Sequence, residues 1–155
     1  MVKIKNVIGR QVFDSRGNPT VEAEIFLDDG SSASAISPSG ASTGAFEAHE
    51  LRDKEQNKFL GKSVNTAVQN INSKISSKLK DLDSNQQENI DKILIELDGS
   101  ENKTNLGANA TLAVSLAYAK CSAITNKQSL YKNLGKSYSL PIPLMNIING
   151  GAHAD

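Results

Sequence analysis

The amino-acid sequence predicts an α+β fold, in which a three-stranded antiparallel meander is followed by helices. Hydrophobic residues alternate with polar ones in the first part of the chain and recur at helical spacing after residue 60. Near the other end, an apolar run without strict alternation lies between prolines and paired glycines. These patterns predict one domain at residues 1–135 and a linker with the first strand of a second, α/β domain at residues 136–155.

The meander is predicted by the two-residue period of half-buried strands. In residues 21–27, Val, Ala, Ile and Leu alternate with Glu, Glu and Phe. Asp29-Gly30 then supplies turn chemistry, and the alternation resumes at residues 33–35. The stretches "VKIKNVI" and "QVF" predict a preceding strand that is joined to the hairpin through "DSRGNPT".

Two amphipathic helices are predicted after residue 60. Apolar residues recur at three- and four-residue spacing through residues 63–80, where Ser63 is expected to accept from the first turn. Ser84 and Gln87 resemble a capping box that opens a second helix, which Gly99 ends.

A third and a fourth helix follow. Residues 109–125 begin with Asn109 as a cap and are small or apolar on nearly every face, which predicts burial on all sides. Cys121 in this helix is expected to be a core residue without a reactive role. A short helix should then close at Gly135, before the apolar run "PIPLMNII", which predicts a strand covered on both faces, as in a parallel sheet.

The composition excludes several functional classes. Seventeen basic and seventeen acidic residues cancel, so the chain has no net attraction to nucleic acid or to an anionic membrane surface. A hydrophobic content of 38% suits a soluble chain, and a single cysteine excludes an internal disulfide framework. The sequence contains no apolar export segment and no run long enough to span a membrane, which predicts a cytoplasmic protein.

Small residues fill "SPSGASTG", residues 37–44, between the meander and the stretch "FEAHELRD". A phosphate-binding P-loop is excluded, because Gly44 is followed by Ala45 and Phe46 instead of Lys and Ser or Thr. Composition alone leaves two interpretations open, an ordinary connection and a lid over a bound ligand. A second glycine-rich segment, "NGGAHAD" with His153, follows the predicted parallel strand and favours a ligand site.

The stretch "FEAHELRD", residues 46–53, is interpreted as helical. Its charged side chains are expected to form a solvated face with local pairing, and His49 is expected to be a surface or helix-packing residue. The two histidines lie far apart in the sequence, and no Cys or His pair has zinc-site spacing.

Seven motifs together resemble the enolase family in order and approximate spacing. They are "DSRGNPT", "PSGASTG", "EAHELRD", "FLGK", "LDG", "NKTNLGANA" and "MNIINGGAHAD". The departures are Ser37 before the loop proline, Thr111 in place of an aliphatic residue, and Ala152 where the family often has Ser or Glu. None of these changes removes a group that is expected to bind a ligand.

The resemblance implies an enolase-type N-terminal capping domain packed against an α/β barrel. The family interconverts 2-phosphoglycerate and phosphoenolpyruvate plus water, a step of glycolysis, with two Mg²⁺ ions. Proton removal beside a carboxylate places further negative charge on an anion, and divalent cations lower that barrier as Lewis acids.

The resemblance also assigns roles to residues of this chain. Ser42 is expected to contact the second Mg²⁺, as a hard oxygen donor does. His153 and Ala41 are expected to lie at the substrate, and Arg10 and Glu22 at the interface of a homodimer. The remaining residues of the expected lid loop are Ser39, Gly40, Thr43 and Gly44.

In the family, the general base Lys, the acid Glu and the three carboxylates of the first Mg²⁺ site all correspond to positions beyond Asp155. The 155 residues alone are therefore expected to be catalytically inactive. Two alternatives stay open: a non-catalytic binding or scaffold module built from the capping domain, and another member of the wider superfamily that acts on a different acid.

Overall fold

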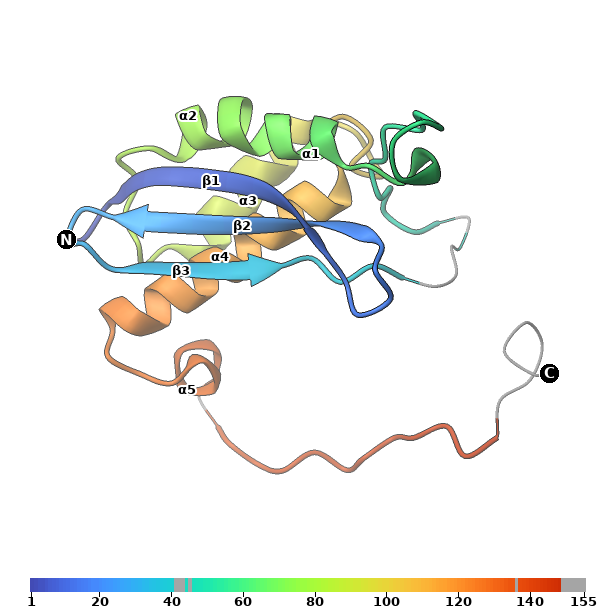
Figure 1. Cartoon of the computed structure of the whole chain (residues 1–155). Coiled ribbons are helices and arrows are strands. Elements are labelled where there is room, and N and C mark those ends of the chain that lie inside the picture. The colour runs from blue at the N-terminus through green and yellow to red at the C-terminus, as the bar shows by residue number, and fades with distance from the viewer. Residues whose placement is uncertain (41–43, 45, 136, 149–155) are drawn as a thin grey trace.

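A three-stranded antiparallel sheet in the order β1-β2-β3 forms one layer of the molecule (Figure 1). The computed structural model describes residues 1–40, 44, 46–135 and 137–148. Strand β1 spans Ile4–Phe13, β2 spans Pro19–Leu27 and β3 spans Ser32–Ile36. The predicted meander is therefore confirmed, including the turn at residues 29–30.

The alternation along β2 determines which face of the sheet carries the core. Val21, Ala23, Ile25 and Leu27 are buried, whereas the intervening Glu22, Glu24 and Phe26 are half-buried on the opposite face. Successive side chains of a strand point to opposite faces, so this two-residue period directs one apolar row toward the helices.

A continuous helical rod runs along β1. It consists of α1 (Asn65–Asn70), a π-helical turn η2 (Ile71–Ile75) and α2 (Ser76–Leu79), and a short 3-10 turn, η1 (Phe59–Gly61), precedes it. Its buried face includes Ile71, Ile75 and Leu79, the apolar positions that recur at helical spacing. The predicted helix at 63–80 is confirmed, with its first residue two positions later.

Helices α3 (Gln87–Asp98), α4 (Ala108–Thr125) and α5 (Leu130–Leu134) complete the domain. Figure 1 shows α4 crossing behind the sheet, where it contacts β2 and β3, with α3 packed against it. Meander and helices together confirm the α+β fold class. No helix within the described part of the chain is long and apolar enough to cross a membrane.

The capping box expected at the start of α3 is not formed. The buried hydroxyl of Ser84 has no hydrogen-bond partner among the described residues, and the Gln87 amide donates to Asp91 and Ser115 instead. The amide of Gln86 donates to the hydroxyl of Tyr118 at 2.7 Å. A tertiary contact from α4 therefore replaces the local cap that the sequence predicted.

Helix α4 is buried on most of its faces, but the prediction of burial on all sides was wrong. The exposed fraction is 42% at Leu112, 38% at Leu116 and 46% at Ile124, whereas Cys121 is fully buried. The sheet, α3 and α5 pack against α4, and Leu112, Leu116 and Ile124 lie where these elements leave it partly uncovered. Burial raises the pKa of the Cys121 thiol to about 11, which agrees with its expected role as a core residue.

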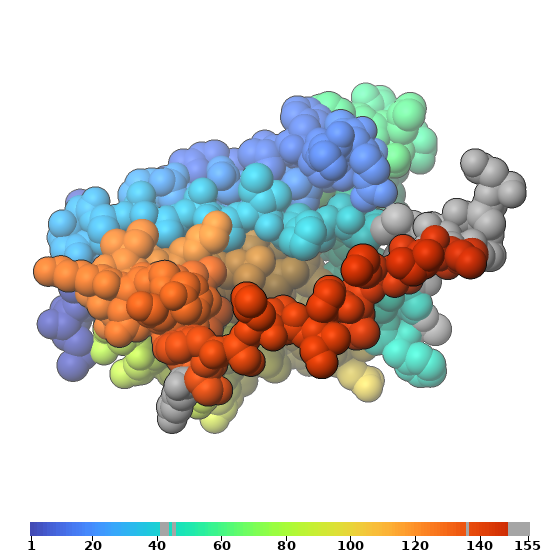
Figure 2. Space-filling view, turned by 90° about the horizontal axis from the view of Figure 1, so that it is seen from below, coloured from blue at the N-terminus to red at the C-terminus, as the bar shows by residue number. Residues whose placement is uncertain are grey.

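The strand predicted at "PIPLMNII" is not formed in this structure. Residues 137–148 contain neither helix nor strand, and Leu140, Leu144 and Ile148 are each at least 90% exposed. The segment follows α5 and runs clear of the sheet (Figure 1), and in the view from below it crosses the face of the molecule as a narrow red band (Figure 2). A parallel strand needs neighbouring strands to bond its backbone, and the described residues supply none here.

Candidate functional site

The stretch that follows the glycine-rich loop is extended, so its interpretation as a helix was wrong. Residues 48–55 contain no helical turn. In "FEAHELRD" only Phe46 and Leu51 are large and apolar, and a spacing of five does not place them on one helix face. The absence of a helical period was the signal that could have identified this segment as extended.

Alternate residues of the extended segment are fastened to the body of the domain. The amide of His49 donates to Asn102 O at 2.7 Å, and its carbonyl accepts from the amide of Ala108 at 2.8 Å. Two residues later, Leu51 exchanges two hydrogen bonds with the side chain of Asn109, at 3.2 and 3.0 Å. The period of two therefore leaves the side chains of residues 50 and 52 on the opposite side of the segment.

Asn109 holds the segment instead of capping α4, which begins one residue earlier than predicted. Gly107 makes this contact possible, because it has a φ of +95° and because a Cβ atom there would lie 2.7 Å from the Cβ of Leu51. The "NLGANA" motif therefore positions the extended segment against the start of α4.

The carboxylate of Asp53 caps α1 from a distant part of the sequence. It accepts from the amides of Asn65 at 2.8 Å and Thr66 at 2.9 Å, a role that the sequence had suggested for Ser63. Partial burial disfavours the ionised carboxylate, but the hydrogen bonds from Thr66, Ser63 and Asn65 outweigh it and lower the pKa of Asp53. Asp53 is thus a structural anchor and not part of a solvated face.

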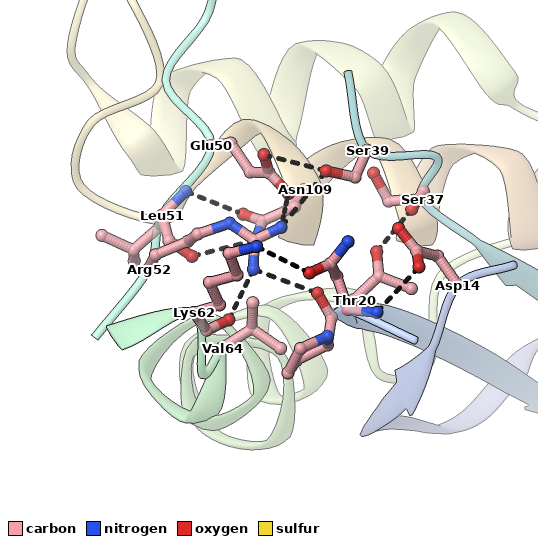
Figure 3. A network of polar contacts seen from close by, with 12 residues as sticks. Asp14, Thr20, Ser37, Ser39, Glu50, Leu51, Arg52, Lys62, Val64 and Asn109 are labelled. Atoms are coloured by element: carbon pink, nitrogen blue, oxygen red, sulfur yellow. Dashed lines mark hydrogen bonds and ion pairs between the residues drawn. The ribbon is translucent and has the colours of Figure 1, made fainter. Parts of the chain in front are cut away.

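The side chains of Glu50 and Arg52 point toward Ser39 at the start of the glycine-rich loop (Figure 3). Nη2 of Arg52 donates to Glu50 Oε1 at 2.8 Å and to Ser39 Oγ at 3.2 Å. Ser39 Oγ in turn donates to Glu50 Oε2 at 3.3 Å. The local charge pairing expected of these residues is present, but it closes a three-membered polar cluster that includes the loop.

Ser37 is fixed just before this cluster. Its amide donates to Val21 O at 2.8 Å, and its carbonyl accepts from the hydroxyl of Thr20 at 2.6 Å. Ser37 is only 2% exposed, and these two backbone hydrogen bonds fix it beside the start of β2.

A cavity of about 540 Å³ lies between the glycine-rich loop and the N-terminal turn of α4. Its described lining comes from three segments, namely Ser37, Pro38, Gly40 and Gly44 of the loop, residues 47–50 with Arg52, and Ala108, Asn109 and Leu112 of α4. Both described ends of the loop therefore border one hollow, whose volume is in the range of small-molecule sites.

The structure places only part of the predicted site. Ser39, Gly40 and Gly44 of the expected lid loop are described, and the two glycines line the cavity. The predicted metal ligand Ser42, the predicted substrate residues Ala41 and His153, and the lid residue Thr43 lie outside the described residues. The structure does not test the roles expected of these four.

Arg10 and Glu22 lie opposite one another on β1 and β2, on the face of the sheet turned away from the helices. Nη1 of Arg10 is 3.3 Å from a Glu22 carboxylate oxygen, and Nη2 is 2.7 Å from Glu24. The charges of Arg10 and Glu22 are therefore paired within the chain. Their role in a dimer stays a prediction.

The residues that the structure describes do not build a Mg²⁺ site by themselves. Among residues 1–40, 44, 46–135 and 137–148, no three His, Cys, Asp or Glu side chains come together in a way that could hold a metal ion. Mg²⁺ prefers several oxygen ligands in near-octahedral geometry. The described part of this chain lacks such a set.

The family comparison agrees with the fold and with the motifs that surround the cavity. The family model described as "Enolase, N-terminal domain" matches residues 4–134, which include the sheet, the extended segment and helices α1–α5. The match covers more than half of the chain, and the chain therefore belongs to the enolase family through this N-terminal domain.

Proposed function

We propose that this chain supplies the capping domain of an enolase, which interconverts 2-phosphoglycerate with phosphoenolpyruvate and water. In this proposal residues 1–135 form the capping domain, and residues 136–155 form the linker and the first strand and loop of the barrel. The cavity of about 540 Å³ beneath the described ends of the glycine-rich loop is the observation that carries the proposal. Membership of the enolase family supports the choice of reaction.

The chain contributes a lid and one metal contact to the proposed site. The loop residues Ser39, Gly40, Ala41, Ser42, Thr43 and Gly44 cover the substrate, and their small side chains allow close approach of the backbone. Ser42 offers an oxygen to one of two Mg²⁺ ions, whose positive charge stabilises the extra negative charge on the substrate carboxylate. Ala41 lies against the substrate, and His153 lies near the phosphate.

The exposed apolar side of α4 supports a capping role. Leu112 and Leu116 are exposed on this side, and Leu112 also lines an apolar cavity of about 320 Å³ between α3 and α4. A domain that packs against a second domain leaves such a surface when it is viewed alone. The apolar cavity and the loop cavity share Ala48, Ala108 and Leu112, so a domain that covers the first would also cover part of the second.

Two further properties follow from the family and are part of the proposal. We place Arg10 and Glu22 at the interface of a homodimer. There the ion pair between them would be replaced by contacts with a second copy of the chain. The protein acts in the cytoplasm, where glycolysis takes place.

The 155 residues alone are proposed to be inactive, because the general base and acid of the reaction come from the barrel. A coupled assay of phosphoenolpyruvate formation, freed of host enolase, should give the rate of a blank without protein. Turnover above that blank would contradict this part of the proposal.

Substitution of Ser42 tests the metal contact in the complete enzyme. Ser42→Ala should raise the Mg²⁺ concentration needed for half-maximal rate and lower kcat by about a hundredfold, the scale of the loss when one positioned hydrogen-bond donor is removed from an oxyanion hole. Ser77→Ala, on an exposed hydroxyl that donates to Lys74 O, is the matched control and should have no effect. An unchanged Mg²⁺ dependence in Ser42→Ala would remove Ser42 from the site.

A non-catalytic binding module is the second candidate, favoured by the apolar cavity between α3 and α4. In that case the complete protein would turn over no 2-phosphoglycerate at any Mg²⁺ concentration. The same coupled assay, run on the complete protein, therefore separates the two candidates.

A further inference from the structure

Arg52 makes more contacts than a surface ion pair needs. Besides Glu50 and Ser39, its guanidinium donates to two backbone carbonyls, Pro19 O at 3.1 Å and Lys62 O. These four acceptors come from the start of β2, from the glycine-rich loop, from the extended segment and from the chain before α1 (Figure 3). One side chain thus joins four parts of the chain that are distant in sequence.

The environment of Arg52 distinguishes it from an ordinary surface charge. Its side chain is 19% exposed, whereas Lys58, which pairs with Glu55 at 2.9 Å, is 52% exposed. Exposed pairs of the second kind contribute little to stability. A guanidinium that is largely removed from water and bonded to one carboxylate and two carbonyls is held in a single geometry.

Ser39 is the member of this cluster that belongs to the loop. Its hydroxyl is bonded by Arg52 and Glu50, and its carbonyl accepts from Nη2 of Arg16 at 3.2 Å. Ser37, two residues earlier, is fixed to β2. The loop therefore starts from a point that is fixed on both the backbone and the side chain of Ser39.

We infer that Arg52 is a positioning residue, which holds Ser39 against Glu50 and so fixes where the glycine-rich loop leaves the body of the domain. The inference rests on the proposed function, because it concerns the same loop. Arg52 also borders the loop cavity, and the role inferred for it is exercised through its contact with Ser39.

The geometry requires arginine at this position. Nη1 donates to the two carbonyls, and Nη2 donates to Ser39 and Glu50. Four acceptors are therefore bonded by two nitrogens of one rigid, planar group. A lysine ammonium keeps the charge but is a single point on a flexible stem. Arg52→Lys should therefore preserve the attraction to Glu50 and lose the placement of Ser39.

Limited proteolysis tests this placement without any enzymatic activity. Phe46 is 98% exposed at the other end of the loop and is a chymotrypsin site, whose cleavage can be followed by mass spectrometry. Arg52→Lys and Ser39→Ala should each accelerate cleavage at Phe46 about tenfold, as expected for loss of a charge-assisted hydrogen bond. Lys58→Gln removes a charge from a nearby exposed pair and should leave the cleavage rate unchanged.

Two results would overturn the inference. The first is cleavage at Phe46 at the wild-type rate in both Arg52→Lys and Ser39→Ala. The second is an acceleration that is equal at Phe46 and at sites within the buried helices, because Arg52 would then stabilise the whole domain without positioning the loop.

A kinetic experiment on the complete enzyme connects the placement to turnover. Arg52→Lys should raise the Mg²⁺ concentration for half-maximal rate several-fold, and Arg52→Gln should raise it further. Combined with Ser39→Ala, Arg52→Lys should add little, because both remove the same contact. Fully additive effects would contradict the inference.

If the complete protein has no enolase activity, only the proposed function fails, and the proteolysis still decides the role of Arg52.

Discussion

Two carboxylates organise the chain by accepting backbone amides. Asp53 caps α1, and Asp98 at the end of α3 accepts from the amides of Ser100 at 3.0 Å and Leu106 at 2.7 Å. Asp98 is 3% exposed, and burial opposes its ionisation, but the hydrogen bonds from Ser100 and Leu106 prevail and lower its pKa. Asp53 thereby fixes the end of the extended segment that borders the loop cavity, and Asp98 shapes the connection that leads to α4.

These lowered pKa values predict a loss of stability in acid. A carboxyl whose pKa is lower in the folded than in the unfolded state stabilises fully above its unfolded pKa, and the contribution is lost as the pH falls through the folded pKa. The free energy of unfolding should therefore be level near neutral pH and fall below about pH 4, the ordinary range of an aspartate pKa.

Asp98→Asn tests this prediction. Urea unfolding at pH 7 should show a loss of about 1–2 kcal/mol, and the decline in acid should become shallower. Glu101→Gln, on an exposed side chain of the same connection, is the control and should leave the pH profile unchanged. An Asp98→Asn profile parallel to that of the wild type would contradict the assigned role.

At the scale of elements, the contact between β1 and the helical rod depends on Gly9 and Asn72. The Asn72 side chain accepts from the amide of Gly9 at 2.7 Å and donates to its carbonyl at 3.1 Å. A Cβ atom on Gly9 would lie 2.9 Å from the Cβ of Ile71. The Asn72 side chain can therefore hydrogen-bond the backbone at the outer edge of β1 only because Gly9 lets the helical rod and the strand approach closely.

Gly9→Ala should separate the rod from the sheet. We expect a loss of about 1–3 kcal/mol in the free energy of unfolding, the usual cost of overpacking a well-packed interface. Lys5→Ala, on an exposed position of the same strand, should change it by less than about 0.5 kcal/mol. Chemical denaturation monitored by circular dichroism measures both, and equal effects of the two substitutions would exclude a packing role for Gly9.

The elements that the sequence predicted well are those whose periodicity is enforced by burial. The alternation at residues 21–27 and the helical spacing at 63–80 each describe one face turned toward a common core. Caps were predicted less well, because Ser63, Ser84 and Asn109 have the chemistry of local caps but find tertiary partners, or none, in the fold. Asp53 shows the converse, since a cap supplied from twelve residues away leaves no local pattern.

At the scale of the whole molecule, the candidate site could be predicted only in part. The glycine-rich loop was identified from its composition and motif, and the structure adds the cavity that its described ends border. The cluster around Arg52 was not identified, because its members are drawn together by four segments and only the finished fold brings them within bonding distance. Long-range polar contacts of this kind leave no periodic signal in a sequence.

Two of the exposed apolar regions among the described residues differ in character. One is the outward side of α4, which belongs to the packed domain. The other is residues 140–148, where Ile142, Leu144 and Ile147 are more than 80% exposed on a segment without secondary structure. Tyr138 marks where the segment leaves the domain, because its hydroxyl donates to Gly135 O at 2.8 Å and its ring packs on Tyr131.

A chain shortened to residues 1–139 should keep the fold and lose most of its affinity for a hydrophobic dye. The contacts of Tyr138 are retained, so the melting temperature should change by less than about 2 °C, as for other surface changes. Dye fluorescence and light scattering should both fall, because exposed apolar segments drive dye binding and association. A matched variant, Leu144→Asp in the 155-residue chain, should give part of the same reduction. If the shortened chain instead binds dye at the original level, the outward side of α4 is the dominant apolar surface, and Leu116→Asp should then reduce the signal.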